Sequence, residues 1–186
     1  MKKSKFIALI ILSAAFLITK TTQLINRNNN AEIVEEKLTQ EEKNKTYDAI
    51  VTKVVDGDTI KIRFVGTIPE ECSAEETIRL IGVNTPELNI HKKKEKEYYA
   101  TEAADFTSKC LSGRSVKLRF DTVSSRRDKY KRLIAYVYHE DYLFNKILIE
   151  QGYGNYYPNF KFEDYYMNLF RGAEFYAKTN HKGKWS

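Results

Sequence analysis

The chain has 186 residues, 30% of them charged, and a formal net charge of +6. This length allows one domain with a hydrophobic core and some additional segments. Half of the net charge lies in residues 1–46, which hold eight Lys or Arg and five Glu, so the net charge alone does not indicate nucleic-acid binding. The two cysteines, Cys72 and Cys110, lack the spacing of a zinc site, and they leave open either one disulfide or two separate thiols.

The first residues have the pattern of an export signal. Met1–Lys5 is basic, and residues 6–18 form an apolar run that only Ser13 interrupts. The run is shorter than the roughly 20 residues that span a bilayer as a helix. No small-x-small cleavage motif follows it, so residues 1–25 are expected to be either a signal peptide or an uncleaved signal anchor. The protein is therefore expected to be extracellular or at the cell surface, with a membrane tether through residues 6–18 if the segment is not cleaved.

The next segment, residues 26–46, is polar and contains three consecutive asparagines followed by a mixture of Glu and Lys. So few apolar residues cannot offset the entropy that ordering the backbone would cost. We therefore expect a polar linker here and a folded domain over residues 47–186.

Five segments of the domain have the patterns of strands. Residues 60–64 alternate apolar and polar side chains, and the run 51–55 before them ends at an Asp-Gly turn signal, so the two predict a β-hairpin. Three further strands are predicted over residues 76–83, 114–121 and 133–138.

Three segments have the period of helices. They are residues 97–111, 143–151 and 163–178, and the third carries an apolar stripe at helical spacing. Five short strands with an intervening helix predict a small β-barrel with helices packed on it, which is an α+β arrangement.

Two charged residues lie at positions that the strand pattern does not explain, Asp58 at a turn and Arg79 on a buried face. Asp58 follows an Asp-Gly pair, and such an aspartate most often serves the turn alone. Arg79 has the same parity as the apolar Ile81 and Val83, so its strand points it towards the buried face. A guanidinium without a partner is costly to bury. Either Arg79 reaches the end of the barrel, or an anion meets it.

The segment after the third predicted strand ends in a rigid corner. Thr85 precedes Pro86, which favours an extended backbone and can hold the Thr85 carbonyl outward as a ligand. Glu87 emerges just past this corner and is free for another task. Basic residues gather in two other places, Lys92-Lys93-Lys94 and residues 126–132, which indicates either a nucleic-acid contact or ordinary solvated loops.

These residues belong to several motifs that occur in a fixed order along the domain. The motifs are Asp56-Gly57-Asp58-Thr59, Arg79 through Thr85-Pro86-Glu87, Asp128-Lys129-Tyr130 with Arg132, and Ile149-Glu150-Gln151-Gly152. In all of them the sequence resembles the thermonuclease family, the staphylococcal-nuclease-like domain. The resemblance implies an OB-fold, a five-stranded Greek-key barrel with three α-helices. It also implies a calcium-dependent nuclease that hydrolyses DNA and RNA phosphodiester bonds to products with 3′-phosphates.

The same resemblance implies roles for single residues. Arg79 and Arg132 match the two arginines that hold the scissile phosphate, and Glu87 matches the proposed general base. Asp58 matches a calcium carboxylate and Thr85 a main-chain carbonyl ligand. Lys129 and Tyr130 match the substrate-binding pair beside the terminal phosphate. Tyr157 matches a substrate-binding tyrosine of the family, or it is an aromatic residue that only packs against its neighbours.

The physical chemistry of phosphodiester hydrolysis agrees with these roles. A phosphodiester gains charge on its equatorial oxygens as water attacks, and a guanidinium can donate paired hydrogen bonds to them where lysine cannot. Calcium is a hard cation that accepts carboxylate, carbonyl and water oxygens. A nearby carboxylate can take the proton from the attacking water.

Asn84 departs from the family pattern, which has an aspartate at this position. The amide oxygen of Asn84 can still bind calcium, but it is neutral, so the affinity for the metal should be lower. The sequence therefore leaves two main alternatives, an active hydrolase or a catalytically silent OB module that binds nucleic acid. A third is an adhesion or envelope module that binds another ligand. In each case we expect a monomer.

Overall fold

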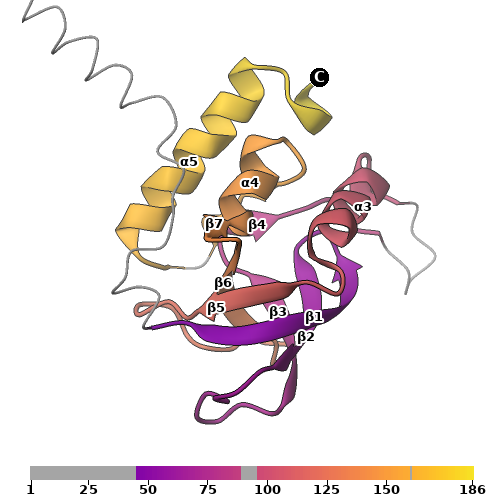
Figure 1. Ribbon diagram of the computed structural model, residues 1–186. Coiled ribbons are helices and arrows are strands. Elements are labelled where there is room, and N and C mark those ends of the chain that lie inside the picture. The colour runs from indigo at the N-terminus through magenta and orange to yellow at the C-terminus, as the bar shows by residue number, and fades with distance from the viewer. Residues whose placement is uncertain (1–44, 89–95, 160) are drawn as a thin grey trace, which may run out of the picture. The chain divides into compact units, whose positions relative to one another are not determined.

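The structure is a computed structural model that describes residues 45–88, 96–159 and 161–186 (Figure 1). The predicted signal, nearly all of the predicted linker and the Lys92-Lys93-Lys94 cluster lie outside the described residues. Within the described part of the chain, no helix has both the length and the apolar character needed to cross a membrane.

Five strands close into a barrel. The strand order is β3-β2-β1-β5-β6, and a parallel pairing of β3 with β6 joins the two ends of this sheet. The other neighbouring strands pair antiparallel. The strands are β1 (Tyr47–Asp56), β2 (Thr59–Phe64), β3 (Glu75–Leu80), β5 (Ser115–Arg119) and β6 (Leu133–His139). The five-stranded barrel that the sequence pattern predicts is therefore confirmed.

Shorter elements complete the domain. The strand β7 (Tyr142–Leu143) forms a hairpin with β6, and β4 (Val83–Asn84) pairs with β8 (Asn155–Tyr156) in a separate two-stranded sheet. The helices are α3 (Ala100–Leu111), α4 (Phe144–Glu150), α5 (Asp164–Thr179) and the 3-10 helix η1 (Gly183–Trp185). Figure 1 shows α4 packed beside α5 above the barrel, whereas α3 lies against the β1 side.

The core forms inside the barrel and under the helices. In β2 the side chains of Ile60, Ile62 and Phe64 are buried, whereas Lys61 and Arg63 are exposed, as the alternation in the sequence predicts. Helix α5 adds buried aromatic side chains to the same core. Burial of each large apolar side chain contributes about 1.5–3 kcal/mol, so the barrel holds the charged residues at its end on a rigid frame.

Two predicted element bounds are wrong for identifiable reasons. The pattern predicts a strand over 76–83, but β3 ends at Leu80 because the chain turns at Gly82, where φ is 71°. A Cβ at Gly82 would also lie 2.6 Å from the Phe170 ring. The helix predicted from residue 97 begins at Ala100, because Tyr99 has a left-handed backbone with φ 70°.

Of the two alternatives for the cysteines, the structure shows separate thiols. Cys72 lies in the loop between β2 and β3, and Cys110 lies on α3. Both are half-buried against the core, and burial raises the pKa of the Cys110 thiol.

Candidate active site

Arg79 lies near the end of β3, where it is paired with Thr59 on β2 and with Ile134 on β6. Its side chain is only 7% exposed, and its Nη1 lies 3.0 Å from the Asp58 carboxylate. The Nη2 group donates to the Asn84 amide oxygen at 3.1 Å. The buried guanidinium therefore has the anionic partner that its burial requires. Removal of either charge would leave the other uncompensated, at a cost of about 3–5 kcal/mol.

Asp58 connects the β1–β2 turn to the segment after β4. One carboxylate oxygen accepts the Thr85 backbone N–H at 2.8 Å, and the other accepts the Thr59 hydroxyl at 3.0 Å. The turn approaches Thr85 so closely that a Cβ at Gly57 would lie 2.8 Å from its hydroxyl oxygen. Only glycine fits there, so the glycine of the Asp-Gly-Asp sequence allows the backbone to approach Thr85 as well as to turn.

Two carboxyl groups meet beside this turn. The Asp56 side chain is buried, and its pKa is raised to about 7, chiefly by burial. A hydrogen bond with the Glu87 carboxyl and the negative charges of Asp58 and Glu87 raise this pKa further, whereas the Gly57 N–H, which donates to Asp56 at 2.8 Å, lowers it. Asp56 is a member of the site that the residue-by-residue prediction missed. The structure shows an irregular register of β1 between Val54 and Asp56, next to this carboxyl group.

Arg132 approaches the same residues from the start of β6. Its Nε and Nη2 groups each lie 2.7 Å from the Asp128 carboxylate, and its Nη1 donates to the Thr59 hydroxyl at 3.3 Å. Thr59 in turn donates to Asp58. The two arginines, which are 53 residues apart in sequence numbering, thus converge on the Asp58–Thr59 pair.

Lys129 and Tyr130 lie on the tight turn before Arg132. The Tyr130 ring is 68% exposed, with the Lys129 ammonium 5.0 Å and the Arg132 guanidinium 5.3 Å from its centre. The Asp128 carboxylate accepts the Tyr130 N–H and so fixes the turn. Tyr157 is placed beside β4 by its own backbone N–H, which donates to the Gly82 carbonyl at 2.9 Å.

The predicted calcium ligands contain a single carboxylate, on Asp58, together with the Asn84 amide and Thr85. Over residues 45–88, 96–159 and 161–186, no group of three His, Cys, Asp or Glu side chains is arranged to hold a metal ion. The donors are nonetheless all oxygen, which is what a hard cation accepts. Thr85 also has a buried hydroxyl oxygen with no hydrogen-bond partner in the described structure. The turn at Gly57 that approaches Thr85 also follows Asp56, whose carboxyl group contacts that of Glu87. The chemistry of the residues therefore fits a hard cation.

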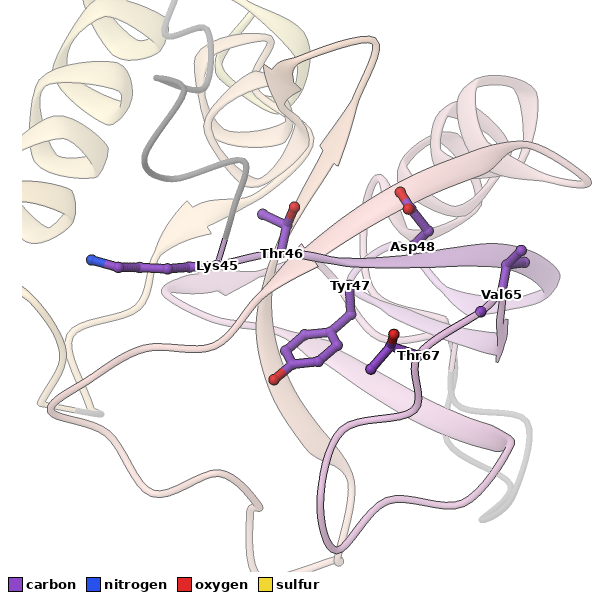
Figure 2. Close-up of a pocket in the computed structure, with 7 residues that line it drawn as sticks. Lys45, Thr46, Tyr47, Asp48, Val65 and Thr67 are labelled. Atoms are coloured by element: carbon purple, nitrogen blue, oxygen red, sulfur yellow. The ribbon is translucent and has the colours of Figure 1, made fainter.

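A surface pocket of about 410 Å³ lies elsewhere, at the start of β1 (Figure 2). It is lined by Lys45, Thr46, Tyr47, Asp48, Val65, Gly66 and Thr67. Figure 2 shows Tyr47 and Asp48 leaving β1 on opposite sides, as residues of a strand do. Asp48 and Asp56 are at opposite ends of β1, so at about 3.3 Å per residue the pocket lies roughly 25 Å from the candidate site. The pocket is not part of the site.

A closed five-stranded barrel with three α-helices, and with its charged residues gathered at one end of strands β1, β2 and β3, defines an OB-fold. Residues 77–186 match the family model described as staphylococcal nuclease homologue. This match covers more than half of the chain, and the chain therefore belongs to the staphylococcal nuclease homologue family. The resemblance noted from the motifs is confirmed.

Several relatives of this chain are named for an activity. The thermonuclease of Staphylococcus hyicus is 33% identical over 123 residues, which cover 64% of this chain and 66% of the relative. The thermonuclease of Staphylococcus intermedius is 36% identical over 116 residues, which cover 61% and 63%. Endonuclease YncB of Bacillus subtilis is 31% identical over 148 residues, which cover 76% and 63%. The chain thus spans just under two thirds of the length of these relatives.

Proposed function

We propose that this protein is a nuclease, a hydrolase that cleaves phosphodiester bonds within DNA and RNA. The observation that carries the proposal is the convergence of Arg79 and Arg132 on the Asp58–Thr59 pair, with the exposed Glu87 alongside. Relatives named thermonuclease and endonuclease support the same activity. An adhesion module would not need this combination of charges.

The two arginines suit the binding of a phosphodiester. Arg79 is held rigidly between Asp58 and Asn84, and Arg132 is held by Asp128. Both guanidiniums can therefore meet the anionic phosphate without a large loss of side-chain entropy. Guanidinium donors that met the equatorial oxygens, on which charge develops, would lower the barrier more than they strengthen substrate binding.

Glu87 is the residue we propose as the general base. Its side chain is exposed, so a water molecule can reach it, and its backbone N–H donates to the Glu97 carboxylate at 2.9 Å. The water gives its hydroxyl to phosphorus while Glu87 takes the proton. The bond to the 5′ oxygen breaks, that oxygen takes up a proton from solvent, and Glu87 returns its proton to solvent, which leaves the phosphate on the 3′ side. The products would then carry 3′-phosphates.

We propose calcium as the cofactor, held by Asp58, Asn84 and Thr85. Bound there, calcium would supply positive charge that stabilises negative charge on the phosphate oxygens. Lys129, Tyr130 and Tyr157 would contact the rest of the substrate.

A cleavage assay tests the proposal. The purified chain should cut a fluorescent oligonucleotide when calcium is present and stop when a chelator removes it. Mass spectrometry of the products should find 3′-phosphate ends. Glu87→Gln is the matched control, because it keeps the size of the side chain and removes its basicity. Its turnover should fall by about 100-fold or more.

A catalytically silent binding module is the second candidate, because Asn84 contributes no charge and occupies a donor of Arg79. If this candidate is right, the protein binds the oligonucleotide but does not cut it at any calcium concentration. This result would overturn the nuclease proposal and keep the nucleic-acid partner.

A further inference from the structure

Five aromatic rings form a continuous row from the core to the surface of the domain. In order they are Phe144, Phe106, Tyr153, Tyr99 and Tyr98. The successive distances between ring centres are 6.0, 4.2, 5.7 and 5.7 Å, and the first two pairs are stacked. We call this row the aromatic stack.

The two ends of the aromatic stack have opposite environments. Phe144 is 2% exposed and belongs to the core, whereas Tyr98 is 72% exposed. Tyr99, between them, has a left-handed backbone with φ 70°, a conformation that a non-glycine residue keeps only when its surroundings hold it there. An exposed ring is thus supported from behind by packed rings, instead of projecting freely into solvent.

Two links join the aromatic stack to the candidate active site. The Glu87 N–H donates to the Glu97 carboxylate at 2.9 Å, and the Glu97 N–H donates to the Glu87 carbonyl at 3.2 Å. Tyr98 follows Glu97 directly, with about 3.8 Å between their Cα atoms. The second link is Gly154, where a Cβ would lie 3.2 Å from the Asn84 carbonyl and 3.3 Å from Thr85.

The second link places Tyr153 as well, because it precedes Gly154 in the chain. Two members of the aromatic stack are therefore chain neighbours of residues that contact Glu87, Asn84 and Thr85. A strand whose phosphate is bound there would pass its neighbouring nucleotides near these rings.

We propose that the exposed end of the aromatic stack, Tyr98, is a platform on which a base of single-stranded nucleic acid stacks, beyond the phosphodiester that is cleaved. The inference rests on the proposed nuclease function and deepens it by naming a subsite and its substrate class. Every base has a flat π-face, so an aromatic platform binds a strand without selecting its sequence. A duplex keeps its bases paired and stacked inside, so this subsite favours single strands.

The surface around Tyr98 favours a nucleic-acid base as the ligand over a protein partner. Tyr98 is a single exposed ring beside charged neighbours, Lys96 and Glu97, which are also exposed. These three residues do not form the contiguous apolar patch that marks many protein interaction sites. Because its support is already ordered, the platform loses little entropy when a base binds.

Steady-state kinetics on a series of substrates tests the proposal. Tyr98→Ala should raise KM for a single-stranded octanucleotide by roughly tenfold, the loss typical of one stacked base, and kcat should be kept. The same variant should cleave a dinucleotide like the wild type. Tyr98→Phe keeps the ring and should behave like the wild type on both substrates. Phe175→Ala, which removes a ring of α5 that is 73% exposed, is the matched control and should change neither.

Abasic substrates give a second, independent readout. In a series of octanucleotides, each lacks the base at a different position. Wild type should bind most weakly to the one whose missing base would face Tyr98. Tyr98→Ala should not respond to that missing base. Equal KM for wild type and Tyr98→Ala on the octanucleotide would overturn the platform, as would an equal loss on the dinucleotide, which would mean that Glu87 had moved.

The outcomes separate this proposal from the proposed function. If wild type cuts nothing, the nuclease fails, and the platform is then judged by the binding of the abasic series alone, measured by fluorescence anisotropy. If wild type cuts and Tyr98→Ala matches it on every substrate, the nuclease stands and the platform falls.

Discussion

At the scale of single residues, the arrangement of Arg132 depends on the shape of the guanidinium. Its Nε and Nη2 pair with Asp128 while Nη1 reaches Thr59, three directions that a lysine ammonium cannot serve from one position. Arg132→Lys should therefore lower kcat by about 100-fold or more while the fold is kept. Single-turnover cleavage measures the loss. Arg171→Lys on the exposed face of α5 is the matched control, and near-wild-type turnover in Arg132→Lys would remove the proposed role.

Asn84 tests the proposed metal site. A second carboxylate there would interact with the cation by up to about 4 kcal/mol at an effective dielectric near 20, before the cost of desolvation. Asn84→Asp should thus lower the calcium concentration for half-maximal activity by about tenfold. Without metal, Arg79 lies between Asp58 and residue 84 and would offset part of the new repulsion, so the melting temperature should fall only slightly.

Calorimetric titration with calcium measures the effect of Asn84→Asp directly. Asn168→Asp adds the same charge on α5 and should leave the affinity unchanged. Equal calcium affinity for wild type and Asn84→Asp would mean that Asn84 binds no metal, and that its hydrogen bond to Arg79 is its role.

Sequence motifs could predict which residues gather at the site, but not how they are paired. Asp58, Arg79, Glu87 and Arg132 could be named because they belong to motifs that lie in or beside the predicted strands. Asp56 was missed because an Asp-Gly pair is common in turns, and only the structure shows its carboxyl against Glu87. The contact of Arg79 with Asn84 is equally invisible in a sequence, since it depends on side-chain direction.

At the scale of elements, an ion pair holds the loop that carries Arg132. Arg127 binds the Glu76 carboxylate through both Nη atoms at 3.0 and 2.8 Å, and it also donates to the Glu71 and Lys131 carbonyls. The hydrogen bonds from Arg127 lower the pKa of Glu76 below its usual 4.5, although burial opposes them. The loop before β3 is therefore tied to the loop before β6.

This lowered pKa predicts an acid dependence of stability. The folded state holds the ionised Glu76 more tightly than the unfolded state does, so the contribution is complete above about pH 4.5 and is lost as pH falls through the folded pKa. Glu76→Gln should melt lower than wild type at pH 7, and the difference should shrink steadily below pH 4.5. Thermal melts of both proteins between pH 3 and pH 7 measure it. A difference that stays constant with pH would show that the pair contributes nothing through charge.

The strands of the barrel could be predicted because alternation reports a buried face, as in β2. The pairing of β4 with β8 could not, because two-residue strands have no period to read and lie far apart in sequence. The end of β3 could not be predicted either. The Ile81 carbonyl accepts a hydrogen bond from the side-chain amide of the distant Asn145 at 2.9 Å instead of one from a neighbouring strand. Local patterns reveal elements, and non-local hydrogen bonds decide where they stop.

At the scale of the whole molecule, the sequence before the barrel bears on where the proposed nuclease would meet its substrate. Met1–Lys5 is basic and residues 6–18 are apolar, the order of the n-region and h-region of an export signal. We propose that this segment sends the domain out of the cytoplasm, where free nucleic acid can reach the open side chains of Glu87 and Tyr98.

Fractionation of cells that produce the full chain tests this proposal. The protein should appear outside the cytoplasm, released if the signal is cleaved and in the membrane fraction if it remains as an anchor. Mass spectrometry of the N-terminus distinguishes these two forms. Deletion of residues 1–25 should retain the protein inside, since the apolar run that the export machinery binds would be gone, whereas deletion within the linker 26–46 should leave export unchanged. A full-length chain found only in the soluble cytoplasm, with its N-terminus intact, would contradict export, and the proposed nuclease would then have to act on intracellular nucleic acid.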